Sequence, residues 1–189
     1  MAFRPLFLLA LTLAAGSAAL GSGTAATAAP LPGFHAGPVF TPFGQVATVA
    51  DADFPIPAGT EFKVLFNVTD GAAKGKINQS IESAARFINM QVEAGVPLDH
   101  IHLAIVAHGP VILDLLNPKA YAARFKGRKN PSRDMVEQLL AKGVQIVVCG
   151  QSSAAQKVAH SDLLPGVKTA LSAMTASALF QQQGYTLNP

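Results

Sequence analysis

The sequence is poor in cysteine, because Cys149 is the only one in 189 residues. One thiol cannot close a disulfide within the chain, so this thiol is buried in the core, joined to another chain or used in chemistry. We also expect no metal site. One cysteine and one well-placed histidine, without further ligand spacing, fall short of the three or four ligands that a metal centre needs.

The sequence also has little net charge, +3 at pH 7 with histidine neutral. Such a balance gives no general case for binding nucleic acid or a membrane surface. After residues 6–13 no second long apolar run follows, so we expect no stable membrane span. No motif for a cofactor is present, and we expect none. With nucleic acid and membranes disfavoured, the expected partners are proteins and small molecules.

The first 28 residues have the three parts of a secretory signal. Arg4 precedes the apolar run 6–13, and a tract of small residues ends in Ala26-Thr27-Ala28. The apolar run is shorter than the roughly 20 residues that span a bilayer, which disfavours an uncleaved anchor. We expect cleavage near Ala28 and a periplasmic or secreted protein.

Residues 29–60 are rich in proline and glycine, and only residues 46–49 resemble a strand. This composition predicts an extended arm lying on the domain, with at most one edge strand.

Residues 61–189 predict one α/β domain. Short apolar, β-branched runs that are typical of buried strands alternate four times with helical patterns. The strands are expected at 61–68, 101–107, 144–149 and 167–172, and the helices near 77–92, 110–116, 131–141, 153–158 and 174–183. Residues 185–187 are expected as a tail. The alternation predicts a three-layer α/β/α fold with a mostly parallel sheet of about four to five strands.

Polar side chains gather where the predicted strands end. Because the carboxyl ends of parallel strands share one rim, these side chains are expected to converge there. They are Asn67, Asp70, His108, Cys149, Gln151 and Ser172. In this arrangement Cys149 is the candidate nucleophile and His108 a candidate base, and Asn67, Asp70, Gly150 and Gln151 are candidate substrate-binding residues.

Two interpretations of Cys149 remain open. Gly150-Gln151-Ser152 reads as a tight turn into a helix, and the positive end of a helix dipole favours a reactive thiolate. Alternatively, Cys149 is a small core residue, since free cysteine is among the most buried residue types. His108 and Asp70 also have ordinary structural explanations, as a backbone-bonded histidine and a turn residue.

Two positively charged stretches have weaker functional interpretations. The loop 71–77 does not match a phosphate-binding loop, because its glycines are one residue too close and Ile77 replaces the required Ser or Thr. Between residues 119 and 133 the chain carries cations and no acid: Lys119, Arg124, Lys126, Arg128, Lys129 and Arg133. Such a run is usually a solvated face, and a subunit contact or an anion-steering rim are the alternatives.

The sequence resembles the DsrE/DsrF-like sulfur-relay family over roughly residues 61–189. The resemblance rests on the turn 66–71 (Phe-Asn-Val-Thr-Asp-Gly), on Ala107-His108-Gly109, on residues 147–152 and on the run from Leu164 to Tyr185. It implies a flavodoxin-like layered fold, trimers or hexamers, and a single strand-end cysteine that carries sulfur as a persulfide. Only Cys149 matches that carrier position. The best-understood members work in the cytoplasm, so an exported chain would have different partners.

Three functions are compatible with these observations. The first is an exported persulfide carrier, in which Cys149 takes sulfur from a donor protein or a small sulfane-sulfur compound and passes it to an acceptor. The second is a cysteine-dependent hydrolase or thiol transferase, which requires a hydrogen bond between Cys149 and His108. The third is a non-catalytic oligomeric binding or scaffold protein with a buried cysteine. A homo-oligomer fits all three.

Overall fold

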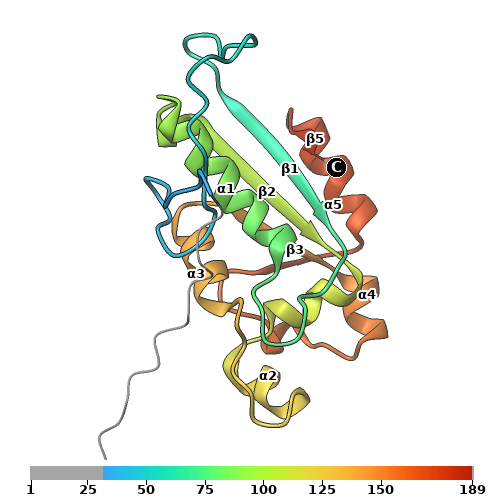
Figure 1. The fold of residues 1–189 in the computed structure, drawn as a ribbon. Helices are drawn as coiled ribbons and strands as arrows, with labels where there is room; N and C mark the ends of the chain where they lie inside the picture. The colour runs from blue at the N-terminus through green and yellow to red at the C-terminus, as the bar shows by residue number, and fades with distance from the viewer. Residues whose placement is uncertain (1–31, 189) are drawn as a thin grey trace, which may run out of the picture.

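The computed structural model describes residues 32–188 (Figure 1). The predicted secretory signal, residues 1–28, lies outside the described residues. Within the part that is described, no helix is both long and apolar enough to cross a membrane.

One sheet of five parallel strands forms the centre of the molecule, in the order β4-β3-β2-β1-β5. The strands are β1 Phe62–Val68, β2 Ile101–Ala107, β3 Gln145–Cys149, β4 Lys168–Ala170 and β5 Thr186–Asn188. This arrangement, with helices flanking the sheet, confirms the predicted α/β fold. The strand β5 is new: residues 185–187 were expected as a tail, but Thr186–Asn188 pairs with β1 at the sheet edge.

The helices connect successive strands. The α-helices are α1 Gln79–Glu93, α2 Pro118–Arg124, α3 Arg133–Ala141, α4 Gly150–Ala155 and α5 Ala173–Gln182. Three short 3-10 helices, η1 Leu98–His100, η2 Gly109–Leu115 and η3 His160–Asp162, lie in the connections. Asn78 is the N-cap of α1, since its side chain accepts a hydrogen bond from the N–H of Ile81 at 3.0 Å.

The sequence did not predict α2. The preceding helix was expected to end near residue 116, and η2 ends at Leu115, but Asn117-Pro118 also begins a new helix. The Asn117 side chain accepts a hydrogen bond from the N–H of Ala120 at 2.9 Å, and Pro118 occupies the first helical position. The helix expected near 131–141 begins two residues later, because α3 starts at Arg133 with Ser132 as its N-cap, and the Asn130 amide donates hydrogen bonds to the carbonyls of Asp114 and Leu116.

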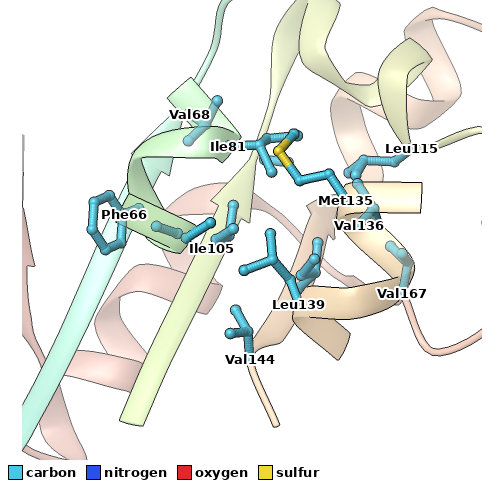
Figure 2. Packing of buried hydrophobic residues seen from close by; sticks show 14 of the residues in the cluster. Phe66, Val68, Ile81, Ile105, Leu115, Met135, Val136, Leu139, Val144 and Val167 are labelled. Atoms are coloured by element: carbon cyan, nitrogen blue, oxygen red, sulfur yellow. The ribbon is translucent and has the colours of Figure 1, made fainter. Parts of the chain in front are cut away.

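Two apolar clusters lie on opposite faces of the sheet. The larger joins alternate residues of the strands to α1, η2 and α3, and Figure 2 shows its packing around Ile105, Met135 and Leu139. The smaller joins Leu65, Val106 and Val147 to α5 through Ala176 and Phe180. Since successive residues of a strand face opposite sides, Cys149 shares the α5 face with Val147.

The segment before β1 packs along α1 (Figure 1). Its side chains Phe40, Phe43 and Val46 are buried, and Phe40 and Phe43 belong to the larger cluster. Residues 46–49 do not form a strand of the sheet; Val46 makes a single antiparallel bridge with His35. Asn89 of α1 is fully buried beneath this segment.

The Asn89 side chain replaces the backbone partners that the irregular segment lacks. Its oxygen accepts hydrogen bonds from the N–H groups of Val39 (3.0 Å) and Phe40 (2.9 Å), and its amide donates to the carbonyls of Phe40 and Gly44, both at 2.9 Å. Gly37 has to be glycine, because a Cβ there would overlap the Asn89 side chain. These contacts satisfy polar groups that would be costly to bury alone.

Candidate functional site

Cys149 is the last residue of β3 and the N-cap of α4. Its side chain is 5% exposed, and its Sγ accepts a hydrogen bond from the N–H of Ser152 at 3.4 Å. The thiol therefore takes the place that a Ser, Thr, Asp or Asn side chain usually takes at the start of a helix. It is positioned by the sheet on one side and by the helix on the other.

The surroundings of Cys149 favour the thiolate. Burial raises the pKa of the Cys149 thiol, but the Ser152 hydroxyl and the backbone N–H groups of Ser152, Ala173 and Gln151 lower it by more. The resulting pKa lies below the ordinary value for cysteine. Ala173 is the first residue of α5, so the starts of two helices, α4 and α5, meet at this sulfur.

Gly150 and Gln151 hold the start of α4 against the end of β4. A Cβ at Gly150 would lie 2.7 Å from the carbonyl oxygen of Ala170 and 3.2 Å from that of Leu171, so any other residue would push the two segments apart. The Gln151 side chain donates a hydrogen bond to the carbonyl of Leu171 at 3.2 Å. Both predicted binding residues therefore lie beside the cysteine. Their contacts with Ala170 and Leu171 fix the start of α4 and so the position of Cys149.

Ser172 also lies at this rim, as the N-cap of α5. Its Oγ accepts a hydrogen bond from the N–H of Thr175 at 3.0 Å, which fixes the first turn of the helix. This cap holds the neighbouring N–H of Ala173 toward the thiol.

His108 lies at the carboxyl end of β2, next to Cys149 across the sheet. Ala107 pairs with Val148, so the following residues, His108 and Cys149, are at matching positions. The backbone N–H of His108 donates to the carbonyl of Val68 at 3.0 Å. Within residues 32–188 the structure shows no hydrogen bond between the His108 ring and the Cys149 sulfur.

Asn67 lies near the end of β1 and Asp70 lies just after it, so both are farther along the same rim. Both are exposed, and no hydrogen bond of residues 32–188 links either side chain to Cys149. The visible contact of Asp70 is through its backbone, whose carbonyl accepts a hydrogen bond from the Asn78 side chain at 2.7 Å. Asn67 and Asp70 share the rim with the thiol without contacting it.

Sequence reasoning missed a buried carboxyl near the rim. Asp114 in η2 is 6% exposed, and its Oδ2 accepts hydrogen bonds from the N–H of Ala72 (2.7 Å) and from the Asn78 amide (2.8 Å). Burial raises the pKa of the Asp114 carboxyl, and the two hydrogen bonds oppose this only in part. A single acid inside the apolar run 111–116 was the signal available in the sequence. Its role is to fix the loop after β1 onto η2.

Comparison with known proteins identifies a family and several similar solved structures, among them the two below. The family model described as the DsrE/DsrF-like family matches residues 63–189. A protein of unknown function from Methanobacterium thermoautotrophicum is 16% identical, with a TM-score of 0.48 over 68% of this chain and 98% of that chain. The ychN protein from E. coli is also 16% identical, with a TM-score of 0.46 over 68% of this chain and 96% of that chain. No curated protein matches the chain significantly.

Proposed function

This chain belongs to the DsrE/DsrF-like family, whose members are generally sulfur-relay proteins, and on that premise we propose that it carries sulfur as a persulfide on Cys149. One observation carries the proposal: the only thiol of the chain lies at the meeting point of two helix starts, where N–H groups lower its pKa. A lowered pKa increases the fraction of the thiol that is in the nucleophilic thiolate form at a given pH.

The loading step needs a donor of sulfane sulfur, and thiosulfate is a simple one. The Cys149 thiolate attacks the outer sulfur of thiosulfate, a bond forms between the two sulfurs, and the bond to the sulfonate group breaks to release sulfite. Charge is conserved, since the thiolate becomes a persulfide anion and no electron leaves the pair of reactants. The Ser152 hydroxyl and the N–H groups around the sulfur stabilise the negative charge before and after loading.

The unloading step is the same exchange in reverse, with a different partner. An acceptor thiolate attacks the outer sulfur of the persulfide, takes it, and leaves the Cys149 thiolate as the leaving group. A leaving thiol of low pKa departs faster, so the same N–H groups assist this step. The cycle needs no second cysteine in this chain.

Cyanolysis tests whether Cys149 holds the sulfur. The purified protein is incubated with thiosulfate or polysulfide, freed of excess reagent, and treated with cyanide, which removes sulfane sulfur as thiocyanate. We expect about one thiocyanate per chain from the wild type and none from Cys149→Ser. Equal release from both proteins would reject the proposal. A Cys149 thiol that also resists iodoacetamide in the folded protein would favour the scaffold function.

We further propose that the protein is exported and that Ala29 is the first residue of the mature chain. The support is the signal-like pattern of residues 1–28, with its basic, apolar and small-residue parts. N-terminal sequencing of the protein from the cell envelope or the medium tests this proposal. A chain that retains residues 1–28, or that stays in the cytoplasm, would contradict it.

The family is often oligomeric, and we propose that this chain forms a homo-oligomer, a trimer or a hexamer. Light scattering coupled to size-exclusion chromatography measures the mass directly. A monomer at every accessible concentration would reject this assembly.

A further inference from the structure

A cluster of positively charged residues lies on and just after α2, which is at the end of the molecule below α4 in Figure 1. We call it the basic lobe and define it as residues 118–129 together with Lys157. Its cations are Lys119, Arg124, Lys126, Arg128, Lys129 and Lys157, all of them exposed. Residues 118–129 contain no acid.

The two arginines of the basic lobe have structural partners. The Arg124 guanidinium donates hydrogen bonds to the carbonyls of Gln156 (2.9 Å) and Lys157 (3.2 Å), which ties α2 to the end of α4. The Arg128 guanidinium carbon lies 5.7 Å from the centre of the Phe125 ring, and its Nε donates to the Phe125 carbonyl. These contacts are sufficient to explain the presence of the two arginines, without a role in binding a partner.

The lysines have no such partners. None of Lys119, Lys126, Lys129 and Lys157 forms an ion pair with a carboxylate within residues 32–188. Their charges are therefore available to a binding partner, and they add to those of the two arginines.

Two of these lysines occupy a strained backbone position. Lys126 and Lys157 both have a φ of 54° and are the described non-glycine residues with positive φ. Each follows the C-cap of a helix, α2 or α4, where glycine is the usual residue because a Cβ disfavours a positive φ. Lysine nevertheless occupies both positions. It places a positive charge at the ends of α2 and α4, which the Arg124 hydrogen bonds hold side by side.

The basic lobe is close to Cys149. The thiol and the lobe lie at the two ends of α4, since Cys149 is its N-cap and Lys157 follows its C-cap, and about 1.5 Å per residue places them roughly 12 Å apart. A protein bound to the basic lobe would therefore also reach the thiol.

The chemistry of the basic lobe favours a protein over nucleic acid or a membrane. Tyr121 is buried and stacks on Phe125, with ring centres 4.4 Å apart, so no exposed ring offers a base a stacking surface. Within residues 32–188 the exposed large apolar side chains all lie outside the lobe, which leaves nothing to insert into a bilayer. Binding to an acidic protein surface requires only the complementary positive charge that the lobe supplies.

We propose that the basic lobe docks an acidic face of the protein that exchanges sulfur with Cys149. This inference rests on the proposed sulfur-carrier function and names the charge of its partner. The lobe supplies orientation and a faster encounter, while the cysteine supplies the chemistry.

The test separates docking from sulfur chemistry by using Cys149→Ser as the background. A fluorescein-labelled peptide of alternating Glu and Ser is titrated with the protein, beside the same peptide with Gln for each Glu. The Lys126→Glu/Lys157→Glu variant is compared with Lys63→Glu/Lys142→Glu. This control makes the same change of net charge at the opposite end of the sheet, where β1 and β3 begin.

We expect the acidic peptide to bind more tightly than the neutral one, with an affinity that falls as salt is added. Reversal of Lys126 and Lys157 should weaken binding about tenfold, and reversal of Lys63 and Lys142 about twofold or less. Equal losses in the two variants, or no preference for the acidic peptide, would overturn the proposal. So would tighter binding of a single-stranded oligonucleotide or of phosphatidylserine vesicles that the same lysine reversal abolishes. Since the background carries no thiol, a failure of the persulfide proposal leaves these results unaffected.

Discussion

The backbone N–H of Ser152 donates a hydrogen bond to the Sγ of Cys149 at 3.4 Å, so the cysteine caps the helix that it begins. This relationship links the local fold to the reactivity of the thiol. The same donors that complete the first turn of α4 stabilise a negative charge on the sulfur.

The Ser152 hydroxyl should control the thiol pKa. Ser152→Ala removes this donor and keeps the backbone N–H, so the pKa of Cys149 should rise. The measurement is the rate of iodoacetamide alkylation against pH, whose midpoint should move upward in the variant. Ser83→Ala is the matched control, because Ser83 is a half-buried residue of α1 whose hydroxyl donates a hydrogen bond to the Gln79 carbonyl of the same helix. An unchanged midpoint in Ser152→Ala would show that the hydroxyl does not act on the sulfur.

Asn89 should hold the N-terminal segment onto α1. Asn89→Ala leaves the N–H groups of Val39 and Phe40 without partners in a buried position, which should lower the free energy of unfolding by about 2–4 kcal/mol. Urea denaturation measures the loss, and faster amide hydrogen exchange at Phe40 should accompany it. Gln79→Ala, an exposed change on the same helix, should leave both nearly unchanged. Comparable losses in the two variants would contradict this role.

The buried Asp114 carboxyl should make stability depend on pH. Burial raises its pKa in the folded state, so the folded protein binds more protons than the unfolded chain above the ordinary carboxyl value of about 4. The stability of the wild type should therefore fall, relative to Asp114→Asn, as pH rises through the folded pKa. Both donors converge on one oxygen, which the asparagine side chain retains. Denaturation curves whose difference is constant with pH would refute this linkage.

The elements that sequence reasoning found are those with a local signal. Buried strands such as β2 are continuous apolar runs, and the prediction at Ile101–Ala107 agrees with the structure residue by residue. Asn78 could be identified as a candidate cap because a residue type that caps helices stands at the start of the helical pattern 77–92. The rim could also be anticipated, since parallel strands end on one side.

The elements that it missed depend on contacts between distant residues. Strand β5 consists of three exposed residues, and only its pairing with β1 makes it a strand. Asn89 looks like an ordinary polar residue of α1, because its partners lie about 50 residues earlier in an irregular segment. The N–H of Ala173 is brought to Cys149 by the packing of α5 over the sheet, which no motif near either residue indicates.

Intact mass spectrometry of the purified protein, before and after incubation with thiosulfate or polysulfide, tests the central claim that Cys149 carries sulfur. The account predicts a gain of about 32 Da, one sulfur atom, that dithiothreitol removes and that Cys149→Ser does not show. An unchanged mass, together with a thiol that resists alkylation in the folded protein, would contradict it.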